Sequence, residues 1–177
     1  MIRTILTATE PSLRQKSKPV NKVDKKILSL ITDMEETLIA QEDPEGIGLA
    51  APQIGKNLRI FVMKPKDTTK VVINPKILSV QKEQKKDKGK KRKKIMEGCL
   101  SLPHFYGPIS RAKEVKLKYL NTKGEEVVET FLGLDAQIVL HEIDHLEGVL
   151  FVDHLLKQKK PLYEYIDGEF EEVDLIV

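Results

Sequence analysis

The stretch Leu140-His141-Glu142-Ile143-Asp144-His145 decides how this chain is organised. Residues four apart in a helix lie on one face about one turn from each other, so the imidazoles of His141 and His145 converge. Two converging imidazoles can bind one metal ion, and the glutamate between them can act as a base towards a water molecule. The alternative is an amphipathic helix with ordinary surface histidines. Other parts of the chain must decide between a metal site and this alternative.

A catalytic site of this type needs a third protein ligand and a position that stays open for water. Metzincin proteases take a third histidine three residues after a glycine, but this chain has Phe151 at that distance from Gly148. The thiolate of Cys99 is favoured because it binds such metals better than a carboxylate, and its glycine-flanked, polar setting is unusual for a buried structural cysteine. The other candidates are His104, His154 and downstream carboxylates such as Glu164.

Composition indicates an enzyme or binding protein of ordinary globular type. A length of 177 residues suits one domain spanning residues 1–177, with 40% hydrophobic and 32% charged residues. The sequence has no secretory signal, and no apolar run approaches the roughly 20 residues of a membrane helix. A single cysteine excludes an intrachain disulfide. We therefore expect a cytoplasmic protein, with neither DNA nor a membrane as a partner.

Charge is unevenly distributed along the chain. The segment 81–94 holds nine basic and two acidic residues, whereas the segment 161–177 holds six acidic residues and no basic one. Like charges at the density of the first segment repel each other, so we interpret it as a lysine-rich insertion between two strands. The second segment reads as an acidic, strand-like tail. The net charge of +3 therefore says little about the body of the protein.

Strand and helix patterns together predict an α+β fold. The metal helix would be central, with mixed, largely antiparallel sheets around it. Asp24 is expected to cap a helix that runs to Leu38, Asp135 to cap the metal helix and Gly148 to end it, and no further helix is expected after Phe151. Strands are predicted at 58–63 and 70–78, with a bulge at Asn74-Pro75, and in hairpins at 112–132 and 163–177.

The small-residue stretch Gly46–Gly55 is unlike an ordinary loop sequence. It matches neither a phosphate-binding loop nor a dinucleotide-binding pattern. Glycines and alanines at this density let the backbone come close to a ligand or a packed strand. We predict a tight loop that carries Gln53 into a crowded place; a plain packing loop is the alternative.

Three motifs resemble the signatures of the peptide deformylase family, in the same order and at similar spacing. They are GIGLAAPQ at 46–53, EGCLS at 97–101 and HEIDH at 141–145, and the resemblance covers roughly residues 1–155. Each motif is moderately specific, and the three together are highly specific. The resemblance implies a hydrolase that removes the N-formyl group from the formyl-methionine of nascent polypeptides and releases formate.

The resemblance also implies roles for individual residues. Cys99, His141 and His145 would hold one divalent metal, with Fe²⁺ expected in cells and Zn²⁺, Ni²⁺ or Co²⁺ able to replace it in preparations. Glu142 would move the protons of the attacking water, and the Gln53 amide and the Leu100 backbone N–H would stabilise the oxyanion. The substrate-binding positions would be Ile47, Gly48, Glu97, Leu134 and Ile138; for Glu97 this means the pocket wall or support of a metal ligand.

The chain departs from the family pattern at Leu140, where glutamine is usual, and in the insertion at 81–94. Leu140 removes a hydrogen bond expected beside the metal. The insertion could contact RNA phosphates, so a degenerate homologue that binds RNA or the ribosome is an alternative, and transient ribosome contact is a hypothesis for the enzyme as well. A metalloendopeptidase is the other rival, which Phe151 argues against.

Overall fold

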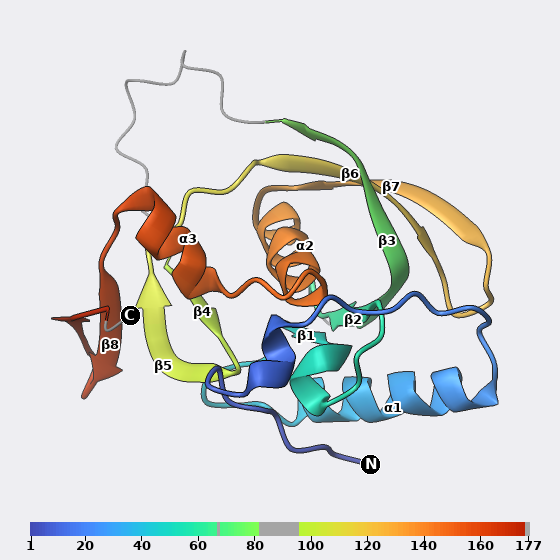
Figure 1. Cartoon of the computed structure of the whole chain (residues 1–177), viewed down its shortest axis with the longest axis horizontal. Helices are drawn as coiled ribbons and strands as arrows, with labels where there is room; N and C mark the ends of the chain where they lie inside the picture. The colour runs from blue at the N-terminus through green and yellow to red at the C-terminus, as the bar shows by residue number, and fades with distance from the viewer. Residues whose placement is uncertain (67, 82–95, 176–177) are drawn as a thin grey trace.

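Within residues 1–66, 68–81 and 96–175, which the computed structural model describes, two antiparallel sheets surround one central helix (Figure 1). The five-stranded sheet has the order β1-β2-β3-β6-β7, and the four-stranded sheet has the order β4-β5-β8-β9. The strands are β1 (Gly48–Ala50), β2 (Ile60–Met63), β3 (Lys70–Gln81), β4 (Glu97–Cys99), β5 (Leu102–Gly107), β6 (Glu114–Leu120), β7 (Glu126–Leu132), β8 (Leu162–Ile166) and β9 (Glu169–Val173). The helices are α1 (Lys25–Ile39), α2 (Gly133–Leu146) and α3 (Phe151–Gln158), with 3₁₀ turns η1 (Pro11–Arg14) and η2 (Ala51–Ile54). The predicted α+β fold is confirmed.

Helix α2 forms the centre of the molecule and lies under the arch of β3, β6 and β7 (Figure 1). Its buried face, which includes Val139, Ile143 and Leu146, packs against Phe61 and other apolar side chains of the five-stranded sheet. Burial of each large aliphatic side chain stabilises the fold by about 1.5–3 kcal/mol. The helix that carries both histidines is therefore fixed by its own core contacts.

Strand β2 is covered on both faces, which explains its unbroken apolar sequence Ile60–Met63. Side chains of a strand alternate between faces, and Phe61 and Met63 join the core cluster of α2. Ile60 and Val62 instead pack in a second cluster with Met34 and Leu38 of α1. Helix α1 thereby supports the sheet from the side opposite to α2.

Two predicted helix boundaries are wrong. Helix α2 begins at Gly133, two residues before the predicted cap Asp135, because the positive φ of Gly133 (56°) lets the chain turn directly out of β7. The chain also does not lose helical character after Phe151, since α3 begins there. Asp153 accepts a hydrogen bond from the Leu150 N–H at 2.9 Å and so satisfies a backbone donor at the start of α3. None of the helices in the described part of the chain is long and apolar enough to cross a membrane.

The predicted turns and bulge are confirmed. Asn74 has a φ of 51°, and the register between β3 and β6 shifts between Ile73 and Lys76. Strands β6 and β7 form the first hairpin, and β8 and β9 form the second around Asp167-Gly168, both at positive φ. Gly148, also at positive φ (74°), follows the end of α2. The lysine-rich insertion lies outside the described residues apart from Gln81, which ends β3.

We predict that Asp24→Ala lowers the free energy of unfolding by about 1 kcal/mol. The Asp24 carboxylate accepts hydrogen bonds from the Lys26 and Ile27 N–H groups, both at 3.0 Å, and alanine leaves these donors at the start of α1 without that partner. Urea denaturation measures the change. Asp24→Asn keeps an acceptor and should stay close to wild type; equal losses in the two variants would contradict the capping role.

Candidate metal centre and active site

The small-residue stretch brings Gln53 into the interior, although its predicted loop structure is wrong. Residues 48–50 form β1 and residues 51–54 form η2, which ends at Gly55 with a φ of 75°. Gln53 is 1% exposed, and its Oε1 accepts a hydrogen bond from the Ala50 N–H at 2.8 Å. Its Nε2 donates to Ser101 Oγ at 3.1 Å and lies 3.6 Å from Cys99 Sγ. The amide is therefore held with its donor end towards Cys99.

Gly48 lets the edge of β1 approach the central helix. A Cβ atom at this position would lie 2.3 Å from Glu142 Oε1, far inside van der Waals contact. A larger residue would therefore displace either the strand or the glutamate. The glycine is required here for close approach.

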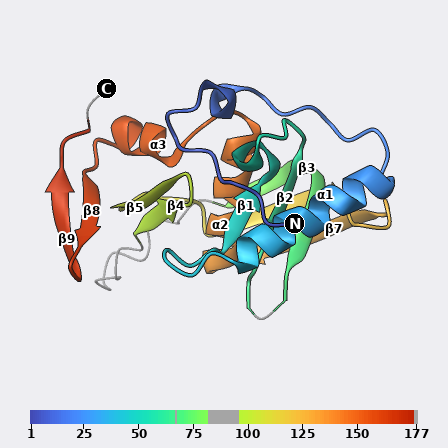
Figure 2. The same cartoon turned by 90° about the horizontal axis from the view of Figure 1, so that it is seen from below.

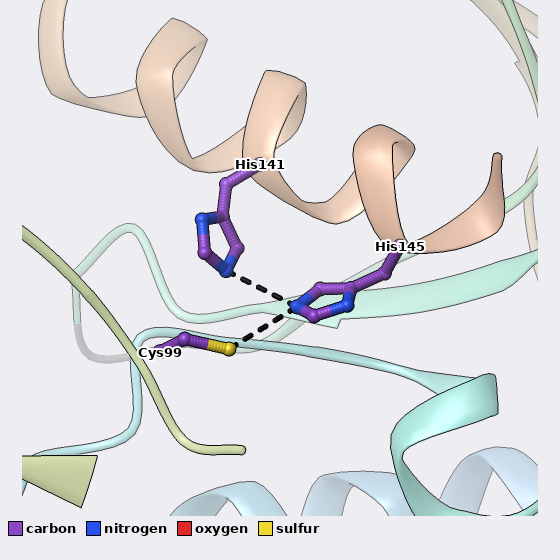
Figure 3. Close-up of side chains that lie close together, drawn as sticks. All are labelled: Cys99, His141 and His145. Atoms are coloured by element: carbon purple, nitrogen blue, oxygen red, sulfur yellow. Dashed lines mark hydrogen bonds between the residues drawn. The ribbon is translucent and has the colours of Figure 1, made fainter. Parts of the chain in front are cut away.

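Cys99, His141 and His145 come together from two different elements, β4 and α2 (Figure 3). A bulge between Gly98 and Cys99 interrupts the pairing of β4 with β5, and a bulge redirects the side chain that follows it. Cys99 Sγ lies 3.3 Å from His145 Nε2, which lies 3.2 Å from His141 Nε2. Within the described residues these three form the one group whose ligand atoms, all within 4.8 Å of one another, could hold a metal.

The distances from His145 Nε2 to the other two ligand atoms are close to those of a tetrahedral metal site. Metal–sulfur bonds of about 2.3 Å and metal–nitrogen bonds of about 2.0–2.1 Å separate neighbouring ligand atoms by roughly 3.3–3.6 Å. Burial alone would raise the pKa of the Cys99 thiol, but the charge of His145 and the hydrogen bonds with both histidines hold that pKa well below its usual value. A thiolate is the form that binds a metal.

None of the other candidate ligands belongs to this group of three. His104 lines the neighbouring cavity, and the Nε2 of His154 donates to Asp144 Oδ2 at 2.8 Å. Glu164 belongs to β8. Phe151, at the sequence position where a metzincin has its third histidine, lies beside His141 with ring centroids 6.4 Å apart.

Glu142 is a buried residue of the cavity wall, and one of its carboxyl oxygens has no hydrogen-bond partner among the described residues. It is 3% exposed, and this oxygen is Oε2. Burial raises the pKa of Glu142 to about 7, against the opposing charges of the two histidines. This carboxyl group is therefore placed to accept and release a proton beside the three ligand atoms.

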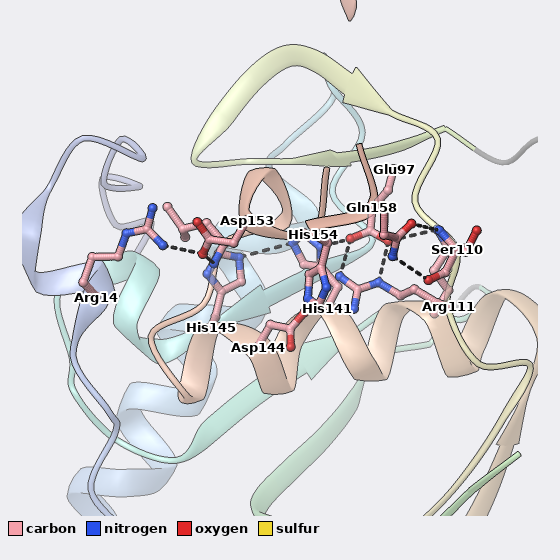
Figure 4. A network of polar contacts seen from close by, with 12 residues as sticks. Arg14, Glu97, Ser110, Arg111, His141, Asp144, His145, Asp153, His154 and Gln158 are labelled. Carbon is pink, nitrogen blue, oxygen red and sulfur yellow. Dashed lines mark hydrogen bonds and ion pairs between the residues drawn. The ribbon is translucent and has the colours of Figure 1, made fainter. Parts of the chain in front are cut away.

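Glu97 supports a histidine through its side chain (Figure 4). Its Oε1 accepts a hydrogen bond from His141 Nδ1 at 2.6 Å, and Arg111 binds both carboxylate oxygens at 2.6 Å. Burial alone would raise the pKa of Glu97, but the hydrogen bonds from Arg111 and His141 hold it well below its usual value. Because Nδ1 donates to Glu97, Nε2 of His141 is the nitrogen left available to bind a metal.

Arg111 and Asp144 extend this network and were missed by the sequence interpretation. Arg111 Nη1 donates to Asp144 Oδ2 at 2.8 Å, and the same oxygen accepts from His154. Asp144 lies inside the motif that carries the histidines, which is a signal that could have found it. Arg111 follows β5 in a loop without any pattern, and only the three-dimensional structure shows its contacts.

A cavity of about 380 Å³ opens beside the three ligand atoms. Its volume lies in the range typical of small-molecule sites. Residues of the three motifs and of α2 line it, and every position predicted to bind substrate contributes to its wall: Ile47, Gly48, Glu97, Leu134 and Ile138. Asp43, Glu45 and Tyr106 also line the cavity and were not predicted. Leu140 is half-buried against the core cluster of α2, so it packs with apolar neighbours.

Comparison with known proteins relates most of the chain to one family. A family model described as Polypeptide deformylase matches residues 2–161. A protein named peptide deformylase from Pseudothermotoga lettingae is 47% identical over 156 residues, which are 86% of this chain and 82% of that protein. The crystal structure of peptide deformylase from Thermotoga maritima has a TM-score of 0.77 at 40% identity, covering 87% of this chain and 97% of that one. A peptide deformylase structure from Legionella pneumophila gives a TM-score of 0.76 at 40% identity, covering 90% of each chain.

We predict that Arg111→Met lowers the free energy of unfolding by about 3 kcal/mol, because it leaves the buried Glu97 carboxylate without its cation. The side chains of Arg111 and Glu97 are 7% and 6% exposed. Arg14→Met is the matched control, since its ion pair with Asp153 is 47% and 35% exposed and should contribute less than about 1 kcal/mol. Urea denaturation of both variants compares the two, and similar losses would contradict the argument.

Proposed function

The chain belongs to the peptide deformylase family, which removes the N-formyl group from nascent polypeptides, and we propose that Cys99, His141 and His145 hold the metal for this reaction. The short distances between their ligand atoms and the lowered pKa of the Cys99 thiol support this assignment. These residues would hold a divalent ion, which would supply a water molecule of lowered pKa as the nucleophile near neutral pH. We propose Fe²⁺ in cells, as the family resemblance implies; the thiolate and imidazole donors would also accept Zn²⁺, Ni²⁺ or Co²⁺.

Glu142 is the group that moves protons in this proposal. Its carboxylate takes a proton from the attacking water and passes it to the amine of the leaving peptide. Its burial and the absence of a partner for Oε2 among the described residues support this role. The products are formate and a peptide with a free N-terminal methionine.

Two N–H donors would stabilise the negative charge that develops on the formyl oxygen. They are the Gln53 Nε2 amide, already held towards Cys99, and the backbone N–H of Leu100, which follows Cys99 in the turn between β4 and β5. A donor of this kind is typically worth about 3 kcal/mol of transition-state stabilisation. Both donors flank the cysteine, so the carbonyl oxygen would be placed next to the metal ligands.

The substrate would enter beside β1, the end strand of its sheet. The backbone of Gly48 can pair with an extended peptide as an added strand would. The methionine side chain would then enter the cavity lined by Ile47, Leu134 and Ile138. Glu97 contributes to the same wall while its carboxylate holds His141.

The alternative of a degenerate homologue receives no support. The groups that the reaction requires, namely three ligand atoms, a buried carboxyl group and an amide donor, lie together beside one cavity. The family match also covers all three motifs. We expect the enzyme to act in the cytoplasm, where ribosomes produce formyl-methionyl chains.

Formate release from a formyl-methionyl dipeptide, measured anaerobically with Fe²⁺, tests this mechanism. We expect Glu142→Ala to lower kcat by about 10³-fold because the proton carrier is lost, while its metal content stays at the wild-type level. Cys99→Ala should lose both the metal and the activity, since a ligand is lost. Full metal content in Cys99→Ala would remove that residue from the ligand set, and an inactive wild type would contradict the hydrolase.

We also propose that the lysine-rich insertion at 81–94, most of which lies outside the described residues, contacts the ribosome near the point where nascent chains emerge. Its charge of +7 complements RNA phosphates, and such contacts weaken steeply with salt. Deleting residues 85–94 should reduce co-sedimentation with ribosomes at low salt and leave dipeptide turnover intact. Replacing the same residues with glycine and serine should have the same effect, and unchanged co-sedimentation in both variants would remove the idea.

A further inference from the structure

We propose that the outer face of the four-stranded sheet binds the nascent peptide beyond its first residues, through an aromatic shelf formed by Tyr106, Tyr163, Tyr165 and Phe170. The inference rests on the proposed function, because the occupant of the shelf is the downstream part of the same substrate. It adds a specificity-determining surface to the reaction. The hairpin that forms most of it, β8–β9, begins at Leu162, after the family match ends at residue 161.

The four rings lie on one face of the sheet. Tyr106 of β5 is paired with Tyr163 of β8, and Tyr165 of β8 is paired with Phe170 of β9. Paired residues of neighbouring strands share a face, as do residues two apart in one strand. Ring centroids of Tyr106 and Phe170 are 5.6 Å apart at an angle of 84°, and those of Tyr165 and Phe170 are 5.0 Å apart. The rings therefore form a contiguous surface.

This face is open to solvent, whereas the opposite face is packed. Tyr165 is 42% exposed and Phe170 is 49% exposed. On the other face, Leu162 and Phe105 pack in a cluster with Leu155 of α3. Figure 2 shows β8 and β9 at one end of the molecule, beyond β5, with α3 to one side of them. Exposed aromatic rings gathered in one place indicate a binding surface more often than scattered apolar residues do.

The aromatic shelf is continuous with the active-site cavity. Tyr106 lines the cavity, and so does Gly98, the residue paired with it in β4. Met96 also lines the cavity, and it lines a second hollow that is bounded by Tyr163 and Phe170. A peptide that leaves the cavity past Met96 therefore meets these rings next.

The spacing of the rings suits an extended peptide. An extended chain advances roughly 3.3–3.6 Å per residue, so the 5.6 Å between Tyr106 and Phe170 corresponds to less than two residues. Aromatic rings contribute their contact area with little loss of side-chain entropy, and they pack against apolar side chains without requiring one sequence. The shelf should therefore favour apolar side chains a few residues after the methionine.

Turnover of two substrates by the Fe²⁺ enzyme tests the proposal: formyl-Met-Ala-Ser and the same tripeptide extended by Leu-Phe-Leu. We expect kcat/KM of wild type to be about tenfold higher for the longer peptide, mainly through a lower KM. The double variant Tyr165→Ser, Phe170→Ser should bring this ratio close to one and leave turnover of the tripeptide unchanged. Unchanged tripeptide turnover also shows that the variant is folded and that the proposed mechanism holds independently of the shelf.

Ile166→Ser is the matched control. Ile166 lies in the same hairpin and is 38% exposed, but as the neighbour of Tyr165 it points to the other face, so the ratio should stay at the wild-type value. A ratio near one in wild type, or an undiminished ratio in the double variant, would overturn the proposal. So would sedimentation showing a wild-type dimer that the double variant loses, because the shelf would then be covered by a second copy of the chain.

Discussion

The buried contact between Glu97 and His141 is the interaction on which the site depends. Glu97 lies on β4 two residues before Cys99, while His141 lies on α2, so one hydrogen bond of 2.6 Å joins the strand that carries the thiolate to the helix that carries both imidazoles. Arg111 keeps the Glu97 carboxylate ionised by binding both of its oxygens. The same carboxylate thus sets the tautomer of one proposed ligand, His141, and lies on the same strand as another, Cys99. Residues behind a metal ligand tune metal sites in this way.

A second constraint comes from how closely β1 approaches α2. Glu142 lies against Gly48, and a Cβ atom at this position would lie 2.3 Å from its Oε1. The sheet is held because β2 is packed on both faces, by α2 on one side and α1 on the other. Close packing of the core therefore holds the Glu142 carboxyl group in position, because densely packed interiors leave little room for displacement. Helix α1 contributes to the site without touching it.

The sequence was sufficient where local pattern and chemistry agree. The spacing of the histidines placed them on one helical face, and the capping residue Asp24 marked the start of α1 correctly. Prediction failed where a contact between distant segments decides the outcome. Helix α3 is only eight residues long, and its buried residues Phe151 and Leu155 pack against Ile109 and Leu162, which lie in other segments of the chain. Arg111 could not be found for the same reason, because its partners belong to β4 and α2.

The proposed third ligand, Cys99, lies on the four-stranded sheet and not on α2. This placement has a physical consequence that a ligand on α2 would not have. Both histidines lie on one helix, α2, but Cys99 reaches them only when the four-stranded sheet is docked against α2. Because metal binding requires that docked arrangement, its free energy also stabilises the junction between the two sheets. The β8–β9 hairpin belongs to the sheet that carries Cys99, and its strands extend that sheet outward from the cavity. A peptide contact on the hairpin would therefore be made on the same sheet as the proposed ligand Cys99, so strand pairing would connect the bound peptide to the proposed metal site.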